Sequence, residues 1–137
     1  MHLEVLPRTE LTLRLMQTIS DGERWRAADI ADAVGSSSHY IARILAPVTQ
    51  AGWVRSTPGP TGGHQLNVDL DDVSVLDMIE AVEGATDSGR CVLVDRPCPA
   101  PEPCSLHDAW IPARDAMTAR LAATPLSSLI EPPEVIT

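Results

Sequence analysis

Three cysteines crowd into one stretch of this 137-residue chain and are its most reactive side chains. Cys91, Cys98 and Cys104 lie within a span of fourteen residues. An odd number of clustered cysteines is unsuited to disulfide pairing, whereas soft thiolates on one segment suit an iron–sulfur cluster or zinc. Both kinds of centre want four ligands. His107 is a candidate for the fourth position, because a helical turn would place it on the same face as Cys104.

The same residue types allow other chemistry, and these alternatives stay open. The thiols could be oxidised reversibly without any metal, could hold a structural zinc ion together with His107, or could be inert. A cysteine and a histidine can also act as nucleophile and base, but no oxyanion-hole loop or orienting acid accompanies them, and Gly62-Gly63 lacks the Lys-Ser/Thr that completes a phosphate-binding loop. We therefore expect an iron–sulfur-binding or zinc-binding adaptor rather than an enzyme from these residues.

Apolar residues at helical spacing predict three helices ahead of the cysteines. The first covers 9–20 and the second 27–34. Three serines at 36–38 offer N-caps for a third helix, which Pro47 should kink or end locally and Gly52 should terminate. Two short helices joined by a glycine-containing turn, behind a first helix, predict a helix-turn-helix.

A hairpin follows the third helix directly. Residues 53–56 and 64–68 are expected to be strands, and the segment 57–63 between them is a turn rich in Gly and Pro. A hairpin placed after a recognition helix is a wing. The pattern therefore predicts a mainly α fold with a small β-wing, a winged helix-turn-helix.

The cysteines lie between two further predicted helices. Ser74 caps the first of them and Gly84 closes it, whereas 85–104 has little periodicity. A long final helix follows, in which Pro112 is tolerable if the helix begins near it, and a short apolar tail lies at 126–130. The apolar positions of the long helix recur at Trp110, Ala113, Met117 and Leu121.

Charge alone argues against nucleic acid, because the formal net charge is -9. The distribution is uneven: residues 1–64 carry six arginines and six acids, whereas 65–137 carry four arginines and thirteen acids. The first part could therefore present arginines on one surface. No apolar run is long enough to cross a bilayer and no secretory signal is visible, so we expect a cytoplasmic protein with no membrane partner.

The order of elements and several short sequence motifs resemble those of the Rrf2 family of transcription regulators, in particular its IscR-like and NsrR-like members. The resemblance covers about residues 9–130 and ends in the three spaced cysteines. The matching motifs are Ile30-Ala31, Tyr40-Ile41, Leu45-Ala46-Pro47, Ala51-Gly52-Trp53-Val54, Gly62-Gly63-His64-Gln65-Leu66 and Ile79-Glu80-Ala81-Val82-Glu83-Gly84.

This resemblance implies a homodimer that binds a palindromic operator in double-stranded DNA, with repression as the commoner mode. It implies a DNA-binding domain over 1–84, a cluster-binding loop over 85–107, a dimerisation helix and tail helix over 108–130, and a disordered 131–137. The cofactor would be a 2Fe–2S or 4Fe–4S cluster that senses nitric oxide, redox state or iron supply.

The same resemblance gives two candidates for the fourth ligand of the cluster. In IscR-like members a histidine occurs at the spacing of His107. In NsrR-like members a carboxylate near the start of the first helix reaches the partner's cluster, and Glu10 stands at the matching place.

A recognition helix presents its first residues to base edges in the major groove. Here those first residues are 37–40. Arg43 lies one helical turn beyond them and could bind a guanine through two hydrogen bonds or contact phosphate only. Tyr40 could instead pack in the core. Many relatives carry an arginine before the wing tip where this chain has Pro58, so a different operator is expected. The candidate DNA contacts are Arg26, Ser37, Ser38, His39, Tyr40, Arg43, Arg55 and His64.

Overall fold

Apolar stripes at helical spacing build the helix-turn-helix. In the computed structural model, which describes residues 2–130, these stripes belong to α1 (Pro7–Thr18), α2 (Ala27–Val34) and α3 (Ser38–Gln50). Gly35 lies between α2 and α3 with a φ of 70°, a left-handed conformation that glycine adopts without strain. Fully buried Leu15, Met16, Ile30 and Ile41 form the centre of the core between the three helices.

The wing is a two-stranded antiparallel hairpin, as the sequence predicts. β1 (Val54–Thr57) pairs with β2 (Gly63–Leu66), with Val54 opposite Leu66. Trp25 adds a short third edge through two backbone hydrogen bonds with His64, of 2.8 and 2.7 Å. Gly63 leaves room for this close approach, because a Cβ there would lie 2.8 Å from the Trp25 carbonyl oxygen. The fold is a mainly helical winged helix-turn-helix.

α4 (Val75–Glu83) joins the domain to the cysteine segment. It begins with a capping box in which the Ser74 hydroxyl accepts from the Asp77 amide, while the Asp77 carboxylate accepts from the Ser74 amide. At its other end Glu83 accepts hydrogen bonds from the Leu6 amide at 3.1 Å and from the Thr9 hydroxyl. α4 thereby satisfies amide and hydroxyl groups at the start of α1.

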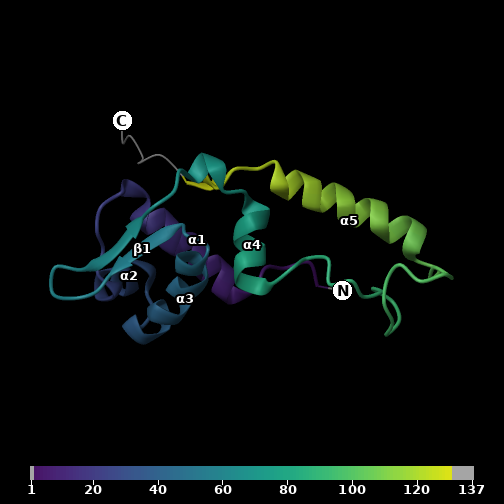
Figure 1. The fold of residues 1–137 in the computed structure, drawn as a ribbon, viewed down its shortest axis with the longest axis horizontal. Helices are drawn as coiled ribbons and strands as arrows, with labels where there is room; N and C mark the ends of the chain where they lie inside the picture. Colours follow the sequence, from purple (N-terminus) through teal and green to yellow (C-terminus); the bar gives the residue numbers. More distant parts are fainter. Residues whose placement is uncertain (1, 131–137) are drawn as a thin grey trace.

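α5 (His107–Ala122) is an arm that leaves the core, with the cysteine segment at the end away from the wing (Figure 1). No residue of α5 is buried. The chain then returns to the domain through the short helix η3 (Leu126–Leu129), where Leu126 is fully buried. Two backbone hydrogen bonds hold this returning segment against the domain: the Leu126 amide donates to the Val73 carbonyl, and the Val75 amide donates to the Thr124 carbonyl.

Several sequence expectations need correction. α5 begins at His107, so Pro112 lies inside the helix and not at its first position, and its missing N–H costs one hydrogen bond. Pro47 does not end α3, which continues to Gln50 because its face on both sides of the proline is buried in the core. α1 begins at Pro7, earlier than the predicted 9–20, and the strands differ from 53–56 and 64–68 by one or two residues at their ends.

Two further points concern the whole chain. Within residues 2–130, no helix has the length and apolar character needed to span a membrane. The predicted disorder of 131–137 lies outside the described residues. The division into segments 1–84, 85–107 and 108–130 stays a prediction.

Candidate functional site

The first turns of α3 present an exposed polar surface. The Ser37 hydroxyl caps the helix by accepting from the Tyr40 amide at 3.1 Å. Its oxygen is thus engaged within the protein, although its hydrogen remains available to donate. Ser38, His39 and Arg43 are exposed. Tyr40 is 37% exposed and does not pack in the core.

The two polar candidates on the wing differ in availability. Arg55 is exposed, and its guanidinium donates to the Asn67 side-chain oxygen at 3.3 Å. His64 is half-buried, and its Nδ1 lies 2.8 Å from the Ser56 hydroxyl. Burial lowers the pKa of His64 and so disfavours its charged form. A charge-assisted contact between His64 and phosphate is disfavoured for the same reason.

Two arginines that precede α2 bind the wing turn. Arg24 donates to the Thr61 carbonyl at 2.6 Å, and Arg26 donates to the Pro60 carbonyl at 2.7 Å. Residues 57–63 carry no charge of their own, so these two side chains bring positive charge to the wing. Arg26 also lines a hollow of about 450 Å³ between α2 and the wing. Their proximity to the wing turn could not be predicted from local periodicity.

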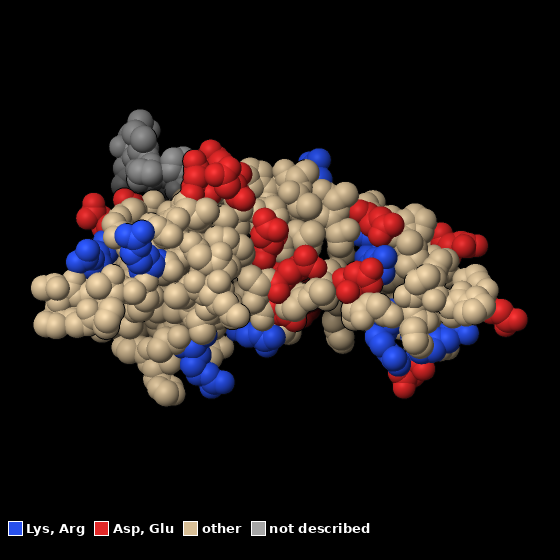
Figure 2. Space-filling view, in the orientation of Figure 1, with Lys and Arg blue, Asp and Glu red and all other residues tan. Residues whose placement is uncertain are grey.

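Two other arginines in residues 1–64 donate hydrogen bonds to backbone carbonyls of neighbouring elements. Arg14 donates to the Val34 carbonyl at 2.7 Å and lies 3.7 Å from the Glu10 carboxylate. Arg8 donates to the Val82 carbonyl at 3.4 Å. On the face shown in Figure 2, acidic side chains gather over the middle of the molecule, and acidic and basic groups lie beside one another at both ends. This face therefore does not separate the two signs of charge.

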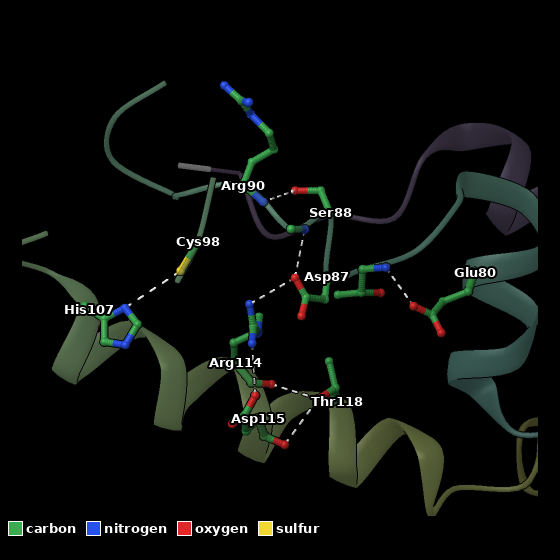
Figure 3. A network of polar contacts seen from close by, with 11 residues as sticks. Glu80, Asp87, Ser88, Arg90, Cys98, His107, Arg114, Asp115 and Thr118 are labelled. Atoms are coloured by element: carbon green, nitrogen blue, oxygen red, sulfur yellow. Dashed lines mark hydrogen bonds and ion pairs between the residues drawn. The ribbon is translucent and has the colours of Figure 1, made fainter. Parts of the chain in front are cut away.

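The structure gathers the four sequence-predicted cluster ligands around one pocket. Cys91, Cys98, Cys104 and His107 all line a cavity of about 20 Å³. All three thiols are free, and the Cys98 Sγ lies 3.8 Å from the His107 Nδ1 (Figure 3). The segment folds back on itself, because the Cys91 amide donates to the Arg96 carbonyl and the Cys98 amide donates to the Gly89 carbonyl. Side chains that are distant along the loop thus share one pocket.

Backbone amides activate one of these thiols. Hydrogen bonds from Val94 and Leu93 lower the pKa of Cys91 to about 7, and the Cys104 side chain and the positive charge of Arg96 act in the same direction. A thiol with this pKa is partly thiolate at neutral pH. Cys91 can therefore act as a metal ligand or as a nucleophile without a separate base.

The donor set fits a soft metal or an iron–sulfur cluster in kind, because it combines thiols with an imidazole. Within residues 2–130, however, no three His, Cys, Asp or Glu side chains are arranged to hold a metal ion. A cavity of about 20 Å³ is comparable with the space of a single water molecule. The loop must therefore widen before these side chains can surround a cluster.

Glu10 is not brought to this pocket within one chain. It is exposed on α1, where it pairs with Arg14. As a ligand it would have to come from a second copy, and its exposure leaves it accessible to one.

The chain is similar to a known family along most of its length. A family model described as "Rrf2: Iron-dependent Transcriptional regulator" matches residues 8–132. The HTH-type transcriptional regulator IscR of Photorhabdus laumondii is 30% identical over 109 residues, which are 80% of this chain and 66% of that protein. The Vibrio atlanticus IscR is 28% identical over 80% of this chain and 62% of its own length. The matched region thus spans slightly less than two thirds of these relatives.

Solved structures share the fold over nearly the whole chain. CymR, the global cysteine regulator of B. subtilis, has a TM-score of 0.74 at 26% identity and covers 94% of this chain and 97% of its own. The oxidised form of Staphylococcus aureus CymR has a TM-score of 0.71 at 26% identity and covers 97% and 100%. T. potens IscR, with a TM-score of 0.65 at 22% identity over 93% and 85%, supports the fold alone.

Proposed function

Because this chain belongs to the Rrf2 family of transcriptional regulators, we propose that it binds a palindromic operator as a homodimer in the cytoplasm and that an iron–sulfur cluster controls this binding. The observation that carries the proposal is the gathering of three thiols and an imidazole in one pocket, on the arm of a winged helix-turn-helix. In this proposal the protein is a non-enzymatic regulator, and repression is its mode of action.

On DNA, α3 would enter the major groove with its first turns toward the base edges. Arg43 would bind a guanine, while Ser38, His39 and Tyr40 contact neighbouring groups and Ser37 donates its hydroxyl hydrogen. At the wing, Arg26 and Arg55 would contact phosphates, and His64 would contribute a neutral ring. Pro58 removes the usual wing arginine, so the charge near the wing turn comes from the side chains of Arg24 and Arg26.

In the pocket, Cys91, Cys98 and Cys104 would hold the cluster, with His107 or the partner subunit's Glu10 as the fourth ligand. When bound, the cluster would supply a redox-active and nitric-oxide-sensitive centre. His107 is the first residue of α5, so its engagement would fix the end of the arm to the loop. Release of His107 would free that end and alter how two copies hold their recognition helices.

Two measurements test this proposal. Protein purified anaerobically should show visible absorbance with stoichiometric iron and sulfide, and Cys98→Ser should lose them. Footprinting should show two half-sites whose occupancy changes on addition of nitric oxide, and the affinity should fall steeply with salt because phosphate contacts release counterions. Colourless protein that contains zinc would contradict the cluster. Absence of any footprint would favour a non-DNA adaptor.

A thiol switch without metal is the second candidate, favoured by the low pKa of Cys91 and the hydrogen bond between its side chain and Cys104. A hydroperoxide would take two electrons from the Cys91 thiolate and leave a sulfenic acid plus water or alcohol. The Cys104 thiol would then attack that sulfur, form a disulfide and release water. Metal-free protein treated with peroxide should lose two hydrogen atoms in mass and change its DNA affinity, and Cys104→Ser should prevent the disulfide.

A further inference from the structure

A ring of polar contacts closes the cysteine loop onto α5, and Figure 3 shows two of its links, from Asp87 to Arg114 and from Cys98 to His107. The Arg114 Nη1 lies 3.4 Å from the Asp87 Oδ1, and that oxygen also accepts from the Gly89 amide at 2.9 Å. The Gly89 carbonyl accepts from the Cys98 amide at 2.9 Å, and the Cys98 Sγ lies 3.8 Å from the His107 Nδ1. His107 and Arg114 stand about two turns apart on one helix, so the ring begins and ends on α5.

The Arg114–Asp87 contact has no equivalent elsewhere in the part of the chain that the structure describes. It is the one ion pair there that joins the segment between α4 and α5 to α5 itself. The Arg90–Asp95 pair lies within that segment, and the contact of Arg114 with Asp115 lies within the helix. The Arg114 side chain is only 21% exposed, so its charge is screened less than that of an ordinary surface arginine.

We propose that the Arg114–Asp87 pair is a clamp that positions Cys98 against His107. Arg114 is a positioning residue in this proposal: it lines the cysteine pocket but acts through Asp87 and Gly89. Asp87 fixes the turn that carries Gly89, and the Gly89 carbonyl in turn fixes the backbone of Cys98. The contacts themselves are independent of any cofactor, whereas their regulatory meaning rests on the proposed cluster.

Arg114 also connects the pocket to a second surface. Together with Trp110 it lines both the cysteine pocket and an apolar hollow of about 280 Å³, whose other walls are Leu3, Ala113 and Met117. A change in the clamp therefore moves a side chain shared by both. Release of the loop would therefore change side-chain positions on the face of α5 through which two copies would pair.

Hydrogen exchange of the full-length, reduced, metal-free protein tests the clamp. Asp87→Asn and Arg114→Met should each accelerate exchange of the Cys98 amide about fivefold, because a partly exposed ion pair contributes that order of stability to a local structure. Asp115→Asn is the matched control, since it removes the same-helix partner of Arg114 without touching the loop, and its exchange should equal that of the unmodified protein.

The outcomes separate this proposal from the function proposed above. Unchanged exchange in both clamp variants, with circular dichroism showing an intact fold, would overturn the clamp, as would equal acceleration in Asp115→Asn. In iron-loaded protein, Asp87→Asn should shorten the lifetime of the visible absorbance several-fold relative to Asp115→Asn. If the protein never takes up iron but the exchange pattern holds, the clamp stands and the cluster proposal fails.

Discussion

At the scale of single residues, the cysteine pocket contains groups with different tasks. Cys91 receives its low pKa from backbone amides, whereas Cys98 receives its position from a carbonyl on the neighbouring turn. His107 stands at the start of α5 and so joins the pocket to a helix. A substitution at each position should therefore change a different observable: reactivity at Cys91, loop order at Cys98 and contact with the arm at His107.

The reactivity of Cys91 should follow its low pKa. In the folded, metal-free protein, alkylation of Cys91 by iodoacetamide should rise with pH around a midpoint of about 7, because the folded state favours the thiolate. In urea the amides of Leu93 and Val94 no longer converge on the sulfur, so the midpoint should rise to about 8.5. Peptide mass spectrometry of time-resolved samples gives both values. Equal midpoints in the two states would contradict the amide effect.

In the proposed complex with DNA, Arg43 would read a base from α3. Arg43→Ala should weaken binding to the operator by about 1–3 kcal/mol and weaken binding to unrelated DNA much less, because a two-pronged contact with guanine is lost. Arg120→Ala is the control, since it removes one exposed arginine from α5, away from the recognition helix. Fluorescence anisotropy on both DNAs measures the losses. Equal losses on the two DNAs for Arg43→Ala would assign this side chain to phosphate.

At the scale of elements, part of the core is covered by η3, which follows α5 in the chain. Leu126 lies in η3 and is fully buried against elements that precede α5. Leu126→Ala should lower the free energy of unfolding by about 2–5 kcal/mol, because it removes buried methyl groups and leaves a cavity. Leu93→Ala makes the same change at a side chain that is 54% exposed, and should cost less than about 0.5 kcal/mol. Urea denaturation compares the two variants, and similar losses would show that η3 does not seal the core.

Elements with a strong local period could be predicted from the sequence, and contacts between distant elements could not. The stripes of α1 to α3 and the Gly-rich wing turn predict their own structures, because each depends on neighbouring residues. The bonds of Arg24 and Arg26 to the wing turn and the burial of Leu126 depend on how elements meet. Pro112 is typical of the first turn of a helix, whereas α5 begins at His107 and contains this proline in its interior.

The candidate site shows the same division. Clustering and spacing made Cys91, Cys98, Cys104 and His107 candidates, with Glu10 as the alternative fourth ligand, and the first four line one pocket. Nothing local predicts that Asp87 meets Arg114 or that backbone amides activate Cys91, since both require the loop to fold back. The size of the pocket was also beyond prediction, because it depends on how tightly the loop closes.

At the scale of the whole molecule, α5 is the α-helix that buries the least surface within one chain. A 16-residue helix without a buried side chain gains little from packing in one chain, and most helices owe their stability to a packed apolar face. Its residues Trp110, Ala113 and Met117 lie on one face and surround the apolar hollow with Leu3. The proposed homodimer would cover this face.

Ala113 and Ala119 allow a matched test of this dimer. Both are exposed alanines inside α5, but only Ala113 lines the apolar hollow. Ala113→Glu places a charge in the proposed interface and should yield a monomer with weak operator binding, because an unpaired charge is costly in a desolvated contact. Ala119→Glu makes the same chemical change outside that hollow and should remain a dimer that binds normally. Light scattering and anisotropy give the two readouts. A dimer in both variants would mean that copies pair through another surface, and monomers in both would point to a general loss of helix stability.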